Sequence, residues 1–135
     1  SQDLLGEDFA RLVFVERDAG SNTERAMTAR PELLGDVILG RKDTPTSYHL
    51  SVVHDDALQG VTHVIRGDDL RASTHIHVLL QKLLGLPTPI YRHHALLTGP
   101  DGKRYAKRDR SLTLAALREA GVSAADIRFR IGLPV

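Results

Sequence analysis

The sequence has 135 residues and a net charge of +1 at pH 7, with 41% hydrophobic and 26% charged residues. This composition is typical of one small globular domain. The net charge is too small to attract nucleic acid by itself, so it excludes a protein that binds nucleic acid through overall charge alone. The absence of cysteine excludes disulfides and thiolate metal sites, and no apolar run approaches the ~20 residues of a membrane span. The start carries no signal-peptide pattern, so we expect a cytoplasmic protein that acts without a membrane.

The amino-terminal segment carries the weakest signals. The apolar run 12–15 predicts a short strand, and the polar run 18–24 predicts a loop. Asn22 or Thr23 is suited to cap a following helix, which would end before Pro31. We recognise no cluster of metal ligands here and therefore expect no zinc site.

The next segment predicts a sheet. Residues 36–43 read as a strand that runs into a charged turn. Residues 48–53 and 61–65 are rich in β-branched side chains, which favours two further strands. The polar link between them ends at Gly60, and Gly67 allows a tight bend after the second strand. The expected order is therefore strand, link, strand, turn and helix.

Arg66 stands at the end of the second of these strands, and either Asp68 or Asp69 can cap the following helix. Open α/β sheets place their ligand-binding groups at the carboxyl ends of strands. The planar guanidinium of an arginine there can bind a carboxylate or a phosphate through two parallel hydrogen bonds. It can equally form a structural ion pair with a nearby aspartate, and the pattern alone leaves both interpretations open.

Residues 70–84 predict a helix, because apolar residues recur at three- and four-residue steps and a glycine follows. His75 and His77 lie two positions apart and point to different faces of this helix. We therefore expect packing or surface histidines rather than a metal-binding pair. Residues 90–97 predict another strand, and the glycines and proline of residues 98–102 predict a turn.

Five of the eight side chains in residues 103–110 are cationic. A charged run is usually a solvated surface, but this one follows a glycine-rich loop just beyond a strand end, which favours a binding function. Residues 114–120 predict a short helix capped by Ser111 or Thr113, and residues 123–126 begin another helix with a capping-box pattern.

The stretch around Arg66 resembles a segment shared by class I glutamyl-tRNA synthetases and their shorter relatives, the glutamyl-Q-tRNA(Asp) synthetases. The matching residues are Tyr48-His49-Leu50, Val53, Asp55-Asp56, Gly60-Val61-Thr62 and Val64-Ile65-Arg66-Gly67. The resemblance is nearly continuous from residue 36 onward. It implies an α/β fold, part of a Rossmann-like class I aminoacyl-tRNA synthetase catalytic domain with short C-terminal helices. It also implies ATP-dependent attachment of glutamate to the queuosine of tRNA(Asp).

The resemblance further implies which residues form the substrate pockets. Tyr48 and Arg66 match residues that contact bound glutamate, and Leu70 matches an apolar residue near that pocket. Leu97 matches a residue whose backbone meets the adenine of ATP, and Asp69 is a weaker candidate for the same area.

The basic run resembles the KMSKS loop of class I synthetases, with Arg104, Tyr105, Ala106, Lys107 and Arg108 in the matching positions. The resemblance implies that Arg104 and Lys107 are catalytic and that Lys107 and Arg108 bind ATP. A cationic loop stabilises the charge that develops on the departing pyrophosphate. Arg104 replaces the usual lysine and Ala106 the usual serine, which changes the geometry and removes a hydroxyl. Mg²⁺ is expected to accompany ATP, held largely by phosphates and water.

The sequence contains no HIGH motif, the ATP-phosphate motif in the first half of such catalytic domains. We therefore expect a connective or insertion segment (1–35), the C-terminal half of the catalytic domain (36–110) and a short helical piece (111–135). The chain is then a truncated form or an excised piece with little activity of its own. Apolar faces left uncovered would favour a homodimer.

Two other functions stay open. The chain can be a fragment of a true glutamyl-tRNA synthetase. The resemblance implies that such an enzyme needs tRNA to activate glutamate, whereas the glutamyl-Q type activates glutamate without tRNA. The chain can also be a non-catalytic RNA- or nucleotide-binding module that uses the basic run. A steep salt dependence of RNA binding without ATP affinity would favour that module.

Overall fold

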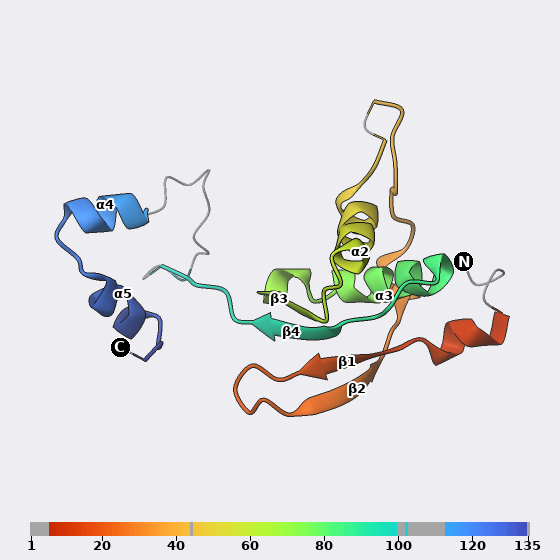
Figure 1. The fold of residues 1–135 in the computed structure, drawn as a ribbon, viewed down its shortest axis with the longest axis horizontal. Coiled ribbons are helices and arrows are strands. Elements are labelled where there is room, and N and C mark those ends of the chain that lie inside the picture. Colours follow the sequence, from red (N-terminus) through yellow and green to blue (C-terminus); the bar gives the residue numbers. More distant parts are fainter. Residues whose placement is uncertain (1–5, 44, 100–101, 103–112, 135) are drawn as a thin grey trace. The chain divides into compact units, whose positions relative to one another are not determined.

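The computed structural model describes residues 6–43, 45–99, 102 and 113–134. Two compact units divide the chain, Ser1–Ala95 and Leu96–Val135. The first unit contains a four-stranded sheet in the order β2-β1-β4-β3, together with the helices α2 and α3 (Figure 1). No helix among the described residues is long and apolar enough to cross a membrane.

The sheet combines an antiparallel hairpin with parallel strands. β1 (Val13–Arg17) and β2 (Glu24–Thr28) form the hairpin, whereas β3 (His63–Gly67) and β4 (Ile90–His94) pair in parallel. β1 also runs parallel to β4. Because parallel strands end at the same edge of a sheet, the carboxyl ends of β1, β4 and β3 come together there.

Helix α3 (Ser73–Leu84) connects β3 to β4 after the short 3-10 helix η3 (Asp68–Leu70). It confirms the helix predicted for residues 70–84, and it ends at Gly85, which takes the left-handed conformation with φ 65°. Its apolar face packs on the sheet in a buried cluster made of Leu12, Phe14, Ala29, Val78, Leu79 and Tyr91. The strands predicted at 12–15 and 90–97 are also confirmed, with slightly different bounds.

The strand predicted at residues 48–53 is wrong, because this stretch begins helix α2 (Tyr48–Leu58). The β-branched pair that suggested a strand contributes instead to a second buried cluster, in which Val53 packs with Ile76 and Leu80 of α3. Figure 1 shows α2 lying next to α3. Tertiary packing therefore overrides the local β preference here.

Two further predictions in the amino-terminal part are wrong. Residues 24–28 form strand β2 rather than a helix, because Asn22 takes a left-handed backbone (φ 60°) in the turn that returns the chain along β1. The carboxylate of Asp18 closes this turn by accepting a hydrogen bond from the backbone N–H of Ser21 at 2.7 Å. Residues 36–43 form no strand. Val37 and Leu39 pack against the α2–α3 cluster instead, whereas Ile38 is exposed.

The second unit contains two short helices. α4 (Leu114–Glu119) is capped by Thr113, whose hydroxyl accepts from the Ala116 backbone N–H. α5 (Ala124–Arg130) begins with a capping box in which Ser123 and Asp126 satisfy each other's backbone N–H groups. Both helices were predicted from sequence, as was the capping box.

One buried hydrogen bond gives a stability prediction for the first unit. The Gln81 amide donates to the Tyr91 hydroxyl at 2.9 Å, and both side chains are buried. Tyr91→Phe is expected to lower the free energy of unfolding by about 1–2 kcal/mol, because the Gln81 amide then loses its partner. The double variant Tyr91→Phe/Gln81→Leu removes both polar groups and should recover most of that loss. Urea unfolding measures both, and equal stability of wild type and Tyr91→Phe would contradict the prediction.

Candidate functional site

The polar site of the first unit lies at the carboxyl edge of the parallel strands. Glu16 comes from β1, Arg66 from β3 and His93 from β4, each at or next to the last residue of its strand. Thr74 and His77 face the same place from the first turns of α3. The sheet and the βαβ crossover thus bring together residues that are far apart in the sequence.

Arg66 is the centre of this site. Its Nε donates to His93 Nε2 at 3.2 Å, one terminal nitrogen donates to His77 Nδ1 at 3.0 Å, and the other donates to the Thr74 hydroxyl at 2.7 Å. The guanidinium also lies over the Tyr91 ring, 5.2 Å from its centroid. Within the described residues, none of these partners is a carboxylate, and no ion pair includes Arg66.

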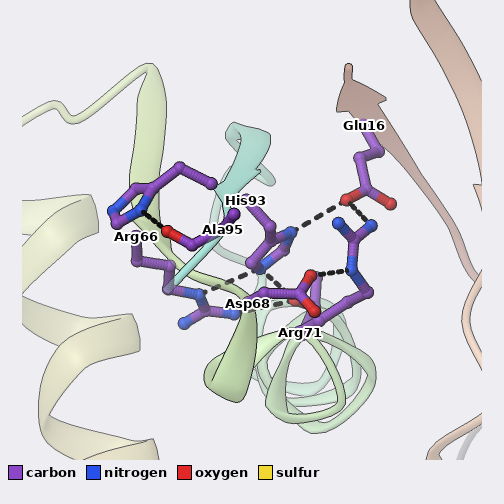
Figure 2. Close-up of polar contacts among 8 residues, drawn as sticks. Glu16, Arg66, Asp68, Arg71, His93 and Ala95 are labelled. Carbon is purple, nitrogen blue, oxygen red and sulfur yellow. Dashed lines mark hydrogen bonds and ion pairs between the residues drawn. The ribbon is translucent and has the colours of Figure 1, made fainter. Parts of the chain in front are cut away.

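The hydrogen bonds assign the tautomers of both imidazoles. His93 accepts from Arg66 at Nε2, so its Nδ1–H donates to Glu16, 2.9 Å away (Figure 2). His77 accepts from Arg66 at Nδ1, so its Nε2–H donates to the Nδ1 of His49 at 3.1 Å. A continuous chain of hydrogen bonds therefore runs from β1 through Arg66 to helix α2.

The surroundings keep both imidazoles uncharged. Burial, followed by the positive charge of Arg66 and the proximity of His49, lowers the pKa of His77 from 6.5 to about 3. Burial also lowers the pKa of His93, although its hydrogen bond to Glu16 acts in the opposite direction. Neutral imidazoles are the forms that can accept from an arginine, so the electrostatics agree with the hydrogen bonds.

Helix α2 closes one side of the site with Tyr48, His49 and Asp56. The Tyr48 ring meets the His77 ring edge to face with centroids 5.7 Å apart, and its side chain is 49% exposed. Burial raises the pKa of Asp56, and the Arg66 cation only partly opposes this shift. Asp56 therefore senses Arg66 through space without forming an ion pair with it.

Arg71 holds the outer edge of the site. It pairs with Glu16 and donates from Nε to Asp68 at 2.6 Å, as Figure 2 shows. Glu16 therefore binds both Arg71 and His93, so its charge is already compensated. The two arginines differ, because carboxylates bind Arg71 whereas uncharged acceptors bind Arg66.

The structure brings two of the predicted glutamate contacts together. Tyr48 and Arg66 both contact His77, from opposite elements. Asp69 and Leu70 lie in η3, directly after the strand that carries Arg66. Leu97 is 55% exposed and belongs to the second unit. The roles predicted for all of these residues in binding glutamate or ATP stay predictions. The predicted Arg104, Lys107 and Arg108 lie outside the described residues.

The sequence-based interpretation missed Thr74, His77 and His93. His77 was expected to be a packing or surface histidine, and it is buried at 1% exposure but contacts Arg66 rather than only apolar groups. The three-residue spacing of Thr74 and His77 was a usable signal, because it puts both on one helix face. The alternation of Tyr91 and His93 on one face of β4 was a second signal. Among the described residues, no group of three His, Asp or Glu side chains could hold a metal ion.

The fold and this site define an α/β domain with a cation at the carboxyl edge of its parallel strands. The family model "tRNA synthetases class I (E and Q), catalytic domain" matches residues 22–129. The chain therefore belongs to the class I glutamyl- and glutaminyl-tRNA synthetase catalytic-domain family, and the predicted fold class is confirmed.

Curated relatives and solved structures agree with this family. The chain is 58% identical over 108 residues to the glutamyl-Q tRNA(Asp) synthetase of Rhodobacter capsulatus, covering 77% of this chain and 39% of that protein. It is 53% identical over 89 residues to the same enzyme of Symbiobacterium thermophilum, covering 66% and 28%. A glutamate tRNA ligase structure from Elizabethkingia meningosepticum, in complex with its amino acid, matches with TM-score 0.55 and 31% identity, covering 72% and 19%. The chain thus spans 39% or less of the length of each of these proteins.

Proposed function

We propose that this chain carries part of the amino-acid-activating site of a glutamyl-Q-tRNA(Asp) synthetase, in which Arg66 binds a carboxylate of glutamate. The observation that carries the proposal is that uncharged acceptors hold Arg66 on three sides, at 2.7, 3.0 and 3.2 Å. A guanidinium without a bonded carboxylate, at the strand edge where α/β sheets bind ligands, attracts an anionic group. Tyr48 would place its hydroxyl beside that group.

The proposed reaction is amino-acid activation followed by transfer. A glutamate carboxylate attacks the α-phosphate of ATP and pyrophosphate leaves, which gives glutamyl-adenylate. A nucleophile of the queuosine of tRNA(Asp) then attacks the glutamyl carbonyl, and AMP leaves. Arg104, Lys107 and Arg108 would stabilise the charge on the departing pyrophosphate, with Mg²⁺ entering as part of the ATP substrate. Leu97 would meet the adenine.

The proposal is supported by the names of the relatives, which include glutamyl-Q tRNA(Asp) synthetases at 58% and 53% identity.

We also propose that the protein is located in the cytoplasm and forms a homodimer. Light scattering that finds only monomer over a wide concentration range would refute the homodimer.

The test is glutamate-dependent exchange of pyrophosphate into ATP, with and without tRNA. We expect exchange without tRNA once the amino-terminal half of a relative is added, and a loss of about tenfold or more in Lys107→Ala, because one cation less faces the leaving pyrophosphate. Lys42→Ala, outside the basic run, serves as control and should exchange normally. No exchange under any of these conditions would refute the proposal.

A glutamyl-tRNA synthetase is the second candidate, because the solved structure at 31% identity is a glutamate tRNA ligase. The same assay separates the two. Exchange that appears only when tRNA is present would favour the second candidate over the glutamyl-Q type.

A further inference from the structure

His77 is the side chain that connects the two halves of the site. It is 1% exposed, and both ring nitrogens are engaged, Nδ1 with Arg66 at 3.0 Å and Nε2 with His49 at 3.1 Å. Its ring also meets the Tyr48 ring at 5.7 Å and the His49 ring at 5.3 Å. A buried group with two directed hydrogen bonds has one orientation, so it fixes what it holds.

Arginines inside proteins are commonly held by carboxylates, and this chain does so for Arg71 with Glu16 and Asp68. A carboxylate in the place of the His77 Nδ1 would also hold Arg66, but it would neutralise the guanidinium. An imidazole nitrogen supplies the same hydrogen bond without charge. Arg66 therefore keeps a positive charge that can attract a ligand, whereas the charge of Arg71 is neutralised by its carboxylate partners.

The other groups around His77 do not neutralise the charge of Arg66 by direct contact. From β3 it faces Arg66 itself, and from α2 it faces Tyr48 and His49. His93 of β4 reaches the far side of the guanidinium through a neutral nitrogen. Asp56 of α2 interacts with Arg66 through space, and burial raises its pKa.

We infer that His77 is a positioning residue, a neutral acceptor that orients the Arg66 guanidinium while leaving its charge available to a ligand carboxylate. The identity of that ligand as glutamate rests on the proposed function. The tautomer of His77 and the available charge of Arg66 do not rest on it, so they can be measured independently.

The first measurement is made on the wild-type chain by ¹⁵N NMR of the imidazole nitrogens at pH 7. We expect an unprotonated Nδ1 and a protonated Nε2 on His77, with a hydrogen-bonded terminal N–H on Arg66. An Nδ1–H tautomer or an imidazolium would overturn the inference, because neither can accept from the arginine.

The second measurement compares two variants of nearly equal shape. His77→Asn puts an uncharged oxygen close to the place of Nδ1, and His77→Asp puts a carboxylate there. Glutamate affinity, measured by calorimetry, should stay within about threefold of wild type in the first and fall roughly tenfold or more in the second, because the new carboxylate competes for Arg66. The thermal midpoint of unfolding is the control for folding. It should not be lower for His77→Asp than for His77→Asn, so that loss of folding does not explain the weaker glutamate binding of His77→Asp.

The third readout separates this inference from the proposed function. Titration of the carboxyl introduced by His77→Asp should give a pKa below the usual aspartate range, because an uncompensated cation lies beside it. An ordinary pKa there, or equal loss of glutamate affinity in both variants, would overturn the inference. A wild-type chain that binds no glutamate, combined with the lowered pKa, would refute the proposed function and leave the inference standing.

Discussion

Arg66→Lys is expected to weaken glutamate binding roughly ten- to hundredfold, the effect of losing one charge-assisted hydrogen bond of about 1.5–3 kcal/mol. The variant keeps the charge but loses the planar fork. In the wild type, the fork donates to His77, Thr74 and His93. A single ammonium cannot satisfy these acceptors and bind a carboxylate from the same position. Calorimetric titration with glutamate measures the change, and circular dichroism checks that the variant is folded.

Arg92→Lys is the matched control for this experiment. Arg92 lies on the neighbouring strand β4 and donates to the backbone oxygen of Ala19 at 2.8 Å, so it belongs to a different set of contacts. Its replacement should leave glutamate affinity unchanged. Glutamine, which has the shape of glutamate without the side-chain charge, is the matched ligand control. Equal affinity of Arg66→Lys and wild type for glutamate would remove Arg66 from the site.

Local patterns predicted those parts of the fold whose structure is decided locally. Helix α3 has a regular apolar face and a glycine stop, and α5 has a capping box formed by Ser123 and Asp126. These signals act within a few residues of each other. They therefore remain readable without knowledge of the partner elements.

The segments predicted wrongly are those whose structure depends on distant partners. Val53 in α2 favours a strand by its side chain, but its contacts are Ile76 and Leu80 of α3. Leu50, Val53 and Ala57 in fact follow helical spacing, which could have corrected the prediction. Strand β2 exists because the turn at Asn22 returns it along β1. Such choices are made by tertiary packing rather than by propensity.

The site was predicted in part for the same reason. Arg66 was identified by its place at a strand end and by resemblance, and Tyr48 by resemblance. His77 and His93 become informative only when the sheet brings them to one guanidinium. The sequence left open whether Arg66 forms a structural ion pair with an aspartate. In the described residues its bonded partners are uncharged, so the geometry favours the ligand-binding interpretation.

The pH dependence of stability tests the electrostatics of His77 without any ligand. Its pKa is about 3 in the folded chain and 6.5 as the ordinary value. Between these two pH values the unfolded chain binds a proton that the folded chain does not. The contribution of the neutral His77 to the free energy of unfolding is therefore fully present above pH 6.5. It is lost progressively as the pH falls toward 3. The lowered pKa of His93 acts in the same direction, whereas the raised pKa of Asp56 acts in the opposite one.

We expect the free energy of unfolding to fall by about 2–3 kcal/mol between pH ~7 and ~4.5 on account of His77, at 1.36 kcal/mol for each pH unit below its unfolded pKa. His77→Asn cannot bind this proton in either state, so urea unfolding of that variant should show a correspondingly flatter pH dependence. His54→Asn makes the same substitution at an exposed histidine of α2 and is the matched control. Identical slopes for wild type and His77→Asn would mean that His77 binds a proton equally well in the folded and the unfolded chain. A charged His77 could not accept the hydrogen bond from Arg66 on which the site depends.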